Sequence, residues 1–169
     1  FLMRIAVKDA NVLIDLDLSG TAGLWFRLKI ETHTTEMVLN QVRKGGHQNV
    51  LAYADTGKIQ VHSTSADILF ECAEWVQDKP DLEIQDASVF LLARRIRAVL
   101  MTGDQDLRTY SEIEQIEVHG TLWIFDQLVE KKLLNPADAA KRLQKLLTQG
   151  RRLPKDECQH RIALWRQHP

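Results

Sequence analysis

Three aspartates lie at places in the sequence where a carboxylate site could be built. Asp9 comes directly after the apolar run 3–7, Asp104 follows the apolar run 98–101, and Asp86 opens a segment with helical periodicity. Carboxylates that cluster in space repel one another, so the pKa of at least one should rise unless a cation neutralises them. Oxygen ligands favour Mg²⁺ or Mn²⁺ over zinc, and such an ion can activate water for phosphodiester cleavage. The pattern therefore predicts that Asp9, Asp86 and Asp104 hold a divalent cation.

Polar neighbours accompany these acids. Asn11 follows Asp9 by two residues and Thr102 precedes Asp104 by two, so their side chains can orient a carboxylate or a water molecule. A simpler interpretation stays open, because aspartate is also common in turns and at helix starts, where the helix dipole favours it. Three acids in three such places nevertheless favour a shared site.

The spacing of apolar residues predicts the elements that position these side chains. The runs 3–7 and 98–101 are typical of buried strands, and shorter runs at 29–31, 59–62 and 116–118 predict further strands. Segments with helical periodicity lie between them, which predicts right-handed crossovers and a parallel sheet with helices on both faces. The carboxyl ends of such strands meet at one edge of the sheet, where open α/β folds place their sites.

Length and composition limit the class of protein. The chain has 169 residues, 44% of them hydrophobic, and a net charge of −1, which is typical of one globular domain without general affinity for polyanions. From Thr121 onward the pattern is entirely helical. Cys72 and Cys158 show no metal-ligand spacing, so a reducing, cytoplasmic compartment is the expectation. No apolar run is long enough to span a membrane.

Two segments of the sequence resemble the PIN domain. AVKDANVLIDL and LEIQDASVFLLARRIRAVLMTGDQDLR follow one another in this order, with D-x-N near the N-terminus, a helical Asp, and T-x-D-x-D after a late strand. The resemblance implies a three-layer α/β/α fold with a central parallel sheet of four to five short strands. It assigns residues 3–120 to a PIN-like nuclease domain and residues 121–169 to a C-terminal helical extension packed on the same domain. The residues that match the family motif are Asp9, Asn11, Asp86, Thr102, Asp104 and the accessory Asp106.

The resemblance also implies an activity. PIN domains are mostly Mg²⁺- or Mn²⁺-dependent ribonucleases, and many are VapC-like toxins held inactive by an antitoxin protein. We therefore expect a cytoplasmic endoribonuclease that cleaves single-stranded RNA by a metal-activated water. An antitoxin and a second copy of the chain are the expected protein partners, with no membrane association. A phosphotransfer receiver domain also has acids at strand ends, but it needs a lysine directly after a late strand, where this chain has Thr102.

One position departs from the family pattern. The family has a Glu in the second turn of the helix after the second strand, whereas aligning TTEMVLNQV by its apolar residues places Gln41 there. Glu36, five residues earlier, either reaches the site from another angle, as a further metal ligand, or is a first-turn residue favoured by the helix dipole. A glutamine offers a neutral oxygen, so the site would bind cations less tightly. A degenerate PIN domain that binds RNA or a protein partner without cleavage is therefore the alternative function.

Basic and aromatic residues outside these motifs have two interpretations. Arg94, Arg95 and Arg108 either bind an RNA backbone or form a solvated helix face. The four tryptophans are expected in the core or in an interface, and stacking on RNA bases is the less favoured alternative. Asp15 is expected on the surface or at a helix end, and Arg151 in a basic loop without a binding role.

Overall fold

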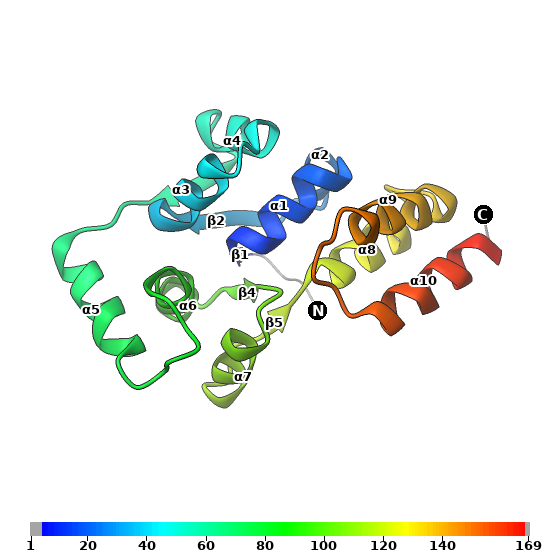
Figure 1. Ribbon diagram of the computed structural model, residues 1–169. Coiled ribbons are helices and arrows are strands. Elements are labelled where there is room, and N and C mark those ends of the chain that lie inside the picture. Colours follow the sequence, from blue (N-terminus) through cyan, green and yellow to red (C-terminus); the bar gives the residue numbers. More distant parts are fainter. Residues whose placement is uncertain (1–4, 168–169) are drawn as a thin grey trace.

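A parallel five-stranded sheet, in the order β3-β2-β1-β4-β5, forms the centre of the molecule (Figure 1). The computed structural model describes residues 5–167, so residues 3 and 4 of the predicted first strand lie outside the described part. The strands are β1 (Ile5–Lys8), β2 (Glu31–Thr35), β3 (Ile59–His62), β4 (Val99–Met101) and β5 (Val118–His119). The predicted α/β/α class with a central parallel sheet is confirmed.

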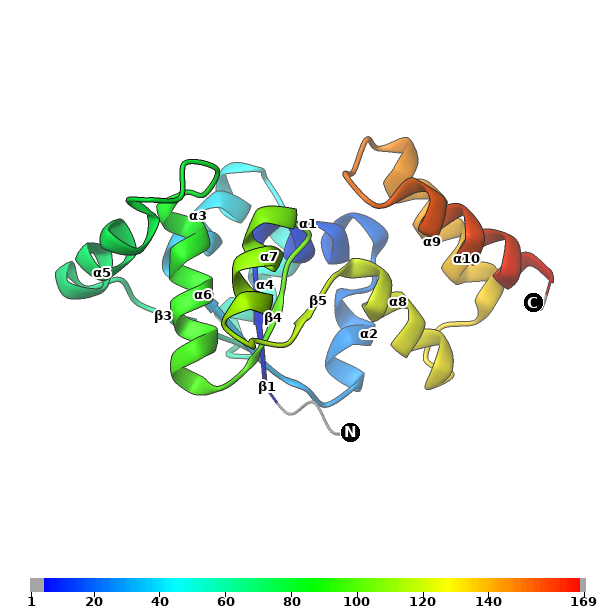
Figure 2. The ribbon, with the colours of Figure 1, turned by 90° about the horizontal axis from the view of Figure 1, so that it is seen from below.

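Helices connect the strands and continue beyond the last one. They are α1 (Ala10–Ser19), α2 (Ala22–Arg27), α3 (Glu36–Lys44), α4 (Gln48–Asp55), α5 (Ala66–Val76), α6 (Ile84–Ile96), α7 (Gln105–Ile113), α8 (Thr121–Glu130), α9 (Pro136–Thr148) and α10 (Lys155–Gln167). Figures 1 and 2 show α9 and α10 side by side at one end of the molecule and α5 at the other end. The predicted helical extension therefore consists of α8, α9 and α10.

Alternate side chains of the strands enter two hydrophobic cores. Ala6 and Met101 belong to the core shared with α2 and the C-terminal helices, whereas Val7 and Leu100 belong to the core shared with α3 to α7. Helix α1 contributes to both cores. This alternation is the two-residue period of a strand, and burial on both faces is typical of a parallel sheet.

Strand β2 occupies a different segment from the one predicted. The sequence pattern placed a brief strand at 29–31, but Lys29 has a left-handed φ of 58° and the strand runs through ETHTT. Its polar side chains are buried because they have hydrogen-bond partners. Thr32 Oγ1 accepts a bond from Trp25 Nε1 at 2.8 Å, and Thr34 Oγ1 donates to the carbonyl oxygen of Lys8 at 2.8 Å. Buried polar groups with partners do not destabilise a strand.

The strand order creates a crevice beside β1. The chain passes from β1 outward to β2 and β3, then crosses back to β4 on the other side of β1. In open α/β sheets a ligand site lies at this reversal, outside the carboxyl ends of the strands. Lys8 pairs with Met101, and the amide of Asp9 donates to the carbonyl oxygen of Met101 at 2.9 Å. The residues after β1 and after β4 therefore lie side by side.

Two further expectations can be compared with the structure. Among the described residues, no helix has the length and apolar character needed to cross a membrane. Cys72 and Cys158 are both buried free thiols.

Candidate functional site

Asp9 lies at the centre of the candidate site. It is the N-cap of α1, and its Oδ1 accepts a hydrogen bond from the amide of Ala10 at 2.7 Å. Its Oδ2 accepts a second bond from the hydroxyl of Thr102 at 2.9 Å. Burial raises the pKa of Asp9, these two hydrogen bonds oppose the rise, and the charge of Asp104 adds to it. Asp9 is thus a buried carboxylate close to a second carboxylate.

The Thr102 hydroxyl joins Asp9 to the turn after β4. Besides donating to Asp9, its Oγ1 accepts a bond from the amide of Asp104 at 3.1 Å. Asp104 is in turn the N-cap of α7, with its Oδ1 accepting from the amide of Leu107 at 2.8 Å. Asn11 adjoins this turn, because a Cβ added at Gly103 would lie 3.9 Å from the Asn11 Cβ. The two predicted acids and both predicted polar neighbours therefore come together at the crevice.

Asp86 approaches the same place from α6. It lies in the first turn of the helix, where its Oδ2 accepts a bond from the amide of Glu83 at 2.7 Å in a capping box. The pKa of Asp86 is raised to about 6, chiefly by burial and further by the negative charges of Asp9, Asp104 and Glu83. The three predicted acids therefore act on one another electrostatically.

The acids fit a hard cation in chemistry but do not form a complete coordination group as placed. Within residues 5–167 no group of three or more His, Cys, Asp and Glu side chains is close enough to hold a metal ion. Each of the three aspartates also bonds a backbone amide at a helix start, which was the simpler interpretation. An ionised carboxylate has about four acceptor positions, so a capping bond leaves room for a cation. Oxygen donors with excess negative charge match Mg²⁺ or Mn²⁺.

Glu36 and Gln41 are both carried by α3. Glu36 is the first residue of this helix, directly after the end of β2, and is exposed. Its Oε2 accepts a bond from the amide of Thr64 at 3.1 Å, so the carboxylate is turned toward the loop after β3. Gln41 lies further along α3 and is half-buried, while Asp106 is exposed in the first turn of α7.

The three predicted RNA-binding arginines lie in different surroundings. Arg94 pairs with Glu114 at 2.9 Å, and Arg95 pairs with Glu71 at 2.8 Å, both near the C-terminal end of α6. Asp86 lies at the opposite end of that helix. Arg108 is instead half-buried beside the site, with its Nη2 3.4 Å from the carbonyl oxygen of Thr102.

Lys8, directly before Asp9, is a buried residue that the sequence pattern did not single out. Its Nζ lies 3.2 Å from the centroid of the Trp25 ring and has no hydrogen-bond partner among the described residues. Burial lowers the pKa of Lys8 well below its usual value. A lysine at the end of an apolar run normally marks the solvent boundary, so no signal in the sequence could have revealed this position.

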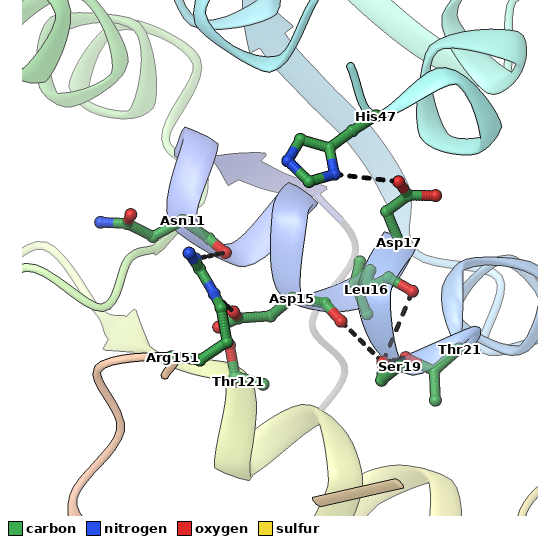
Figure 3. Close-up of polar contacts among 9 residues, drawn as sticks. All are labelled: Asn11, Asp15, Leu16, Asp17, Ser19, Thr21, His47, Thr121 and Arg151. Carbon is green, nitrogen blue, oxygen red and sulfur yellow. Dashed lines mark hydrogen bonds and ion pairs between the residues drawn. The ribbon is translucent and has the colours of Figure 1, made fainter. Parts of the chain in front are cut away.

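Asp15 contradicts the prediction that it lies on the surface. Its side chain is 5% exposed, its Oδ2 accepts a bond from the Thr121 hydroxyl at 2.6 Å, and its Oδ1 pairs with Arg151 Nε at 2.6 Å (Figure 3). Arg151 also donates to the carbonyl oxygen of Asn11 at 3.3 Å, so it lies in the loop before α10, as predicted, but has a structural role there. These contacts join α1 to α8 and to the loop before α10. Their partners are more than 100 residues apart, beyond the reach of local pattern analysis.

Comparisons with known proteins agree with this architecture. The family model described as "DUF3368: PIN domain" matches residues 5–167. VapC20 of Mycobacterium tuberculosis, described as a sarcin-ricin loop cleaving toxin, has a TM-score of 0.50 at 20% identity, over 62% of this chain and 94% of its own. The protein PAE2754 from Pyrobaculum aerophilum has a TM-score of 0.52 at 15% identity, over 76% of this chain and 91% of its own.

A further similar structure is the PilT N-terminus domain protein SSO1118 from Sulfolobus solfataricus. Its TM-score is 0.50 at 13% identity, over 75% of this chain and 94% of its own. A search of curated proteins found no match. At these identities the solved structures show a shared fold and nothing finer. The family model, however, covers nearly the whole chain, and together with the sheet order and the acids at the strand ends it shows that the chain belongs to the PIN-domain family.

Proposed function

We propose that this protein is a metal-dependent endoribonuclease of the PIN type. The observation that carries the proposal is the link from Asp9 through the Thr102 hydroxyl to the turn of Asp104, at the reversal of the strand order. Asp86 completes the cluster. Burial is the main cause that raises its pKa to about 6, and a cation would relieve the further rise caused by the charges of Asp9 and Asp104.

Asp9, Asp86 and Asp104 would hold Mg²⁺ or Mn²⁺, with Asp106 as a further ligand. Glu36 could join them only by releasing the amide of Thr64, from which its carboxylate accepts a bond. When bound, such an ion lowers the pKa of water and stabilises negative charge that develops on phosphate oxygens. The residues of the chain position that chemistry. Thr102 orients Asp9, and the capping bonds fix the carboxylates of Asp86 and Asp104 against rotation.

RNA is proposed as the substrate because the chain is a PIN domain and because VapC20, which shares its fold, is described as a toxin that cleaves the sarcin-ricin loop. Arg108 lies beside the site, where its guanidinium can bind the RNA backbone. Arg94 and Arg95 remain candidates only for a longer RNA, because each is engaged with a glutamate near the far end of α6. A toxin role, an antitoxin partner, a homodimer and a cytoplasmic location belong to the same proposal.

The proposal is tested with the variants Asp9→Asn and Asp104→Asn. We expect each to lower cleavage of a labelled single-stranded RNA in Mn²⁺ by at least ~10²-fold, because each removes a charge from the reacting centre. Asp67→Asn is the matched control, since Asp67 is an exposed first-turn carboxylate on α5. Cleavage that persists in both site variants would refute the proposed site.

A second function is supported by two specific observations. Gln41 replaces the family glutamate, and the carboxylates as placed do not form a complete coordination group within the described residues. Both favour a PIN domain that binds RNA or a protein partner without cleaving. Wild-type protein that binds RNA but cleaves none in Mg²⁺ or Mn²⁺ would establish this alternative. Gln41→Glu should then restore cleavage if the missing charge is the cause.

A further inference from the structure

A cavity of about 390 Å³ lies between the site and the C-terminal helices. Thr102 and Gly103 line it on the side of the acids, and Arg152 and Pro154 line it on the side of the loop before α10. We call it the C-terminal cavity. Its volume is within the range of pockets that bind small molecules, roughly 300–1,000 Å³. Because Thr102 belongs both to the cavity and to the acid cluster, a ligand in the cavity would adjoin the reacting bond.

The charges that line the C-terminal cavity favour an anion. Arg161 pairs with Asp126 at 2.9 Å and with Glu157 at 3.4 Å, which leaves these three side chains with a net charge of −1. Arg108 is half-buried and Arg152 is exposed. With these two arginines the charged side chains that line the cavity sum to +1, although the net charge of the whole chain is −1.

The first turn of α8 also favours an anion. Gly120 is its N-cap and has no side chain to bond the free amides, while the Thr121 hydroxyl is turned to Asp15. The amides of residues 121–123 therefore lack the usual side-chain cap, and all three residues line the cavity. A Cβ added at Gly120 would lie 3.3 Å from Arg108 Nη2, which places that guanidinium beside the helix N-terminus. Free amides next to an arginine are suited to a phosphate group.

Two aromatic side chains also line the C-terminal cavity. Trp123 and His119 both line the cavity, and their rings stack with centroids 4.5 Å apart at an interplanar angle of 18°. Trp123 is only partly buried. Stacking on aromatic rings is how proteins hold unpaired bases of single-stranded RNA.

We propose that the C-terminal cavity binds one nucleotide of the RNA next to the cleaved bond. The phosphate lies at the first turn of α8 between Arg108 and Arg152, and the base lies against Trp123. The C-terminal helices are thereby part of the substrate-binding site and help to select the RNA. This inference rests on the proposed function in taking RNA as the ligand and in placing the nucleotide beside the cleaved bond.

Binding of a short fluorescent single-stranded RNA, followed by anisotropy in EDTA over a range of salt concentrations, tests the inference without any cleavage. Arg152→Gln should weaken binding about fivefold and reduce the slope of log K against log salt by about 0.7, because it removes one phosphate contact. Arg166→Gln is the matched control, since Arg166 is also exposed but lies in the last turn of α10. Arg166→Gln should change neither the affinity for RNA nor the salt slope.

The proposed contact with the base is tested by variants of Trp123. Trp123→Leu should weaken binding of the same RNA about fivefold, whereas Trp123→Phe, which keeps an aromatic face, should bind nearly as the wild type does. Circular dichroism melting of each variant shows whether it is folded.

The outcomes separate this inference from the proposed nuclease function. Equal affinity and salt slope for the wild type, Arg152→Gln and Arg166→Gln would overturn the inference, even if the wild type cleaves RNA. A wild type that binds no RNA would overturn it as well. Loss of binding in Arg152→Gln together with no cleavage by the wild type would support the cavity and refute the nuclease.

Discussion

At the scale of single residues, the site aspartates have two roles at once. Asp9, Asp86 and Asp104 each bond an amide at a helix start, and together they place negative charge in one crevice. The capping bonds stabilise the fold, whereas burial and repulsion raise the pKa of Asp9 and Asp86. In the absence of a cation, the ionised cluster therefore destabilises the native state.

The opposing effects of capping and of charge on stability can be measured at Asp86. Its pKa is raised from 3.8 to about 6, so the folded state holds the proton more tightly than the unfolded chain. The contribution of Asp86 to the free energy of unfolding therefore falls as the pH rises from 3.8 to about 6, and it is smallest above that range. Asp86→Asn keeps a capping oxygen and removes the charge. We expect it to raise the Tm in EDTA at neutral pH by roughly 3–6 °C, equivalent to about 1–2 kcal/mol.

Thermal shift in EDTA and in MnCl₂, at pH values on both sides of the Asp86 pKa, measures the effect. Mn²⁺ should raise the Tm of the wild type at neutral pH and that of Asp86→Asn much less, because the cation binds the charged cluster. Asp67→Asn serves as the control and should leave both quantities unchanged. A lower Tm for Asp86→Asn at neutral pH in EDTA would contradict the argument.

At the scale of elements, α6 shows how a helix is fixed at both ends. A capping box that includes Asp86 begins it, and Arg97 ends it with a left-handed φ of 54°. The amide of Arg97 bonds the carbonyl oxygens of Ala93 and Arg94, which satisfies the last turn. A side chain in this conformation is disfavoured by roughly 1–2 kcal/mol, whereas glycine adopts it readily.

Replacement of Arg97 by glycine should therefore stabilise the protein. We expect the free energy of unfolding in urea to rise by about 0.5–1 kcal/mol, because relief of backbone strain exceeds the added entropy of the unfolded chain. Arg94→Gly, one turn earlier in the same helix, should instead lower it by about 1 kcal/mol. If both variants lose stability equally, the left-handed conformation is not a source of strain.

At the scale of the whole molecule, the C-terminal helices and the sheet form one structure. Side chains of α8, α9 and α10 share a core with α1, α2 and one face of β1 and β4. The Asp15, Thr121 and Arg151 contacts add a polar link between α1, α8 and the loop before α10. The C-terminal cavity lies in this same region, and Arg152, which lines it, directly follows Arg151 of the link.

Arg151→Met tests the link. It would leave Asp15 buried with Thr121 as its remaining side-chain partner, and we expect the free energy of unfolding at neutral pH to fall by roughly 2–3 kcal/mol. The loss should shrink as the pH falls, because Asp15, whose pKa burial already raises, then takes up a proton.

Two further variants complete this test. Asp15→Asn added to Arg151→Met should recover most of the stability, since no buried charge remains. Arg152→Met, at the adjacent exposed position, should have little effect. Urea denaturation of the wild type, Asp15→Asn, Arg151→Met, the double variant and Arg152→Met gives the comparison. Additive losses in the double variant would show that Asp15 and Arg151 are not coupled.

The sequence by itself predicted a parallel sheet and the acids of the candidate site, although it misplaced β2. Apolar runs ending in Asp9 and in Thr102-Gly103-Asp104 required parallel strands with their carboxyl ends at one edge, and Asp86 followed from the helical period. Local pattern was sufficient because strand alternation and helix caps depend on neighbours a few residues away.

The tertiary structure alone decided which polar residues are buried and which partners they meet. ETHTT is a buried strand because Thr32 and Thr34 find Trp25 and the Lys8 carbonyl, and Asp15 is buried because Arg151 reaches it. A polar side chain can be buried only where a partner meets it. Several of these partners lie on distant segments of the chain, so their identity is settled only when the helices have packed on the sheet.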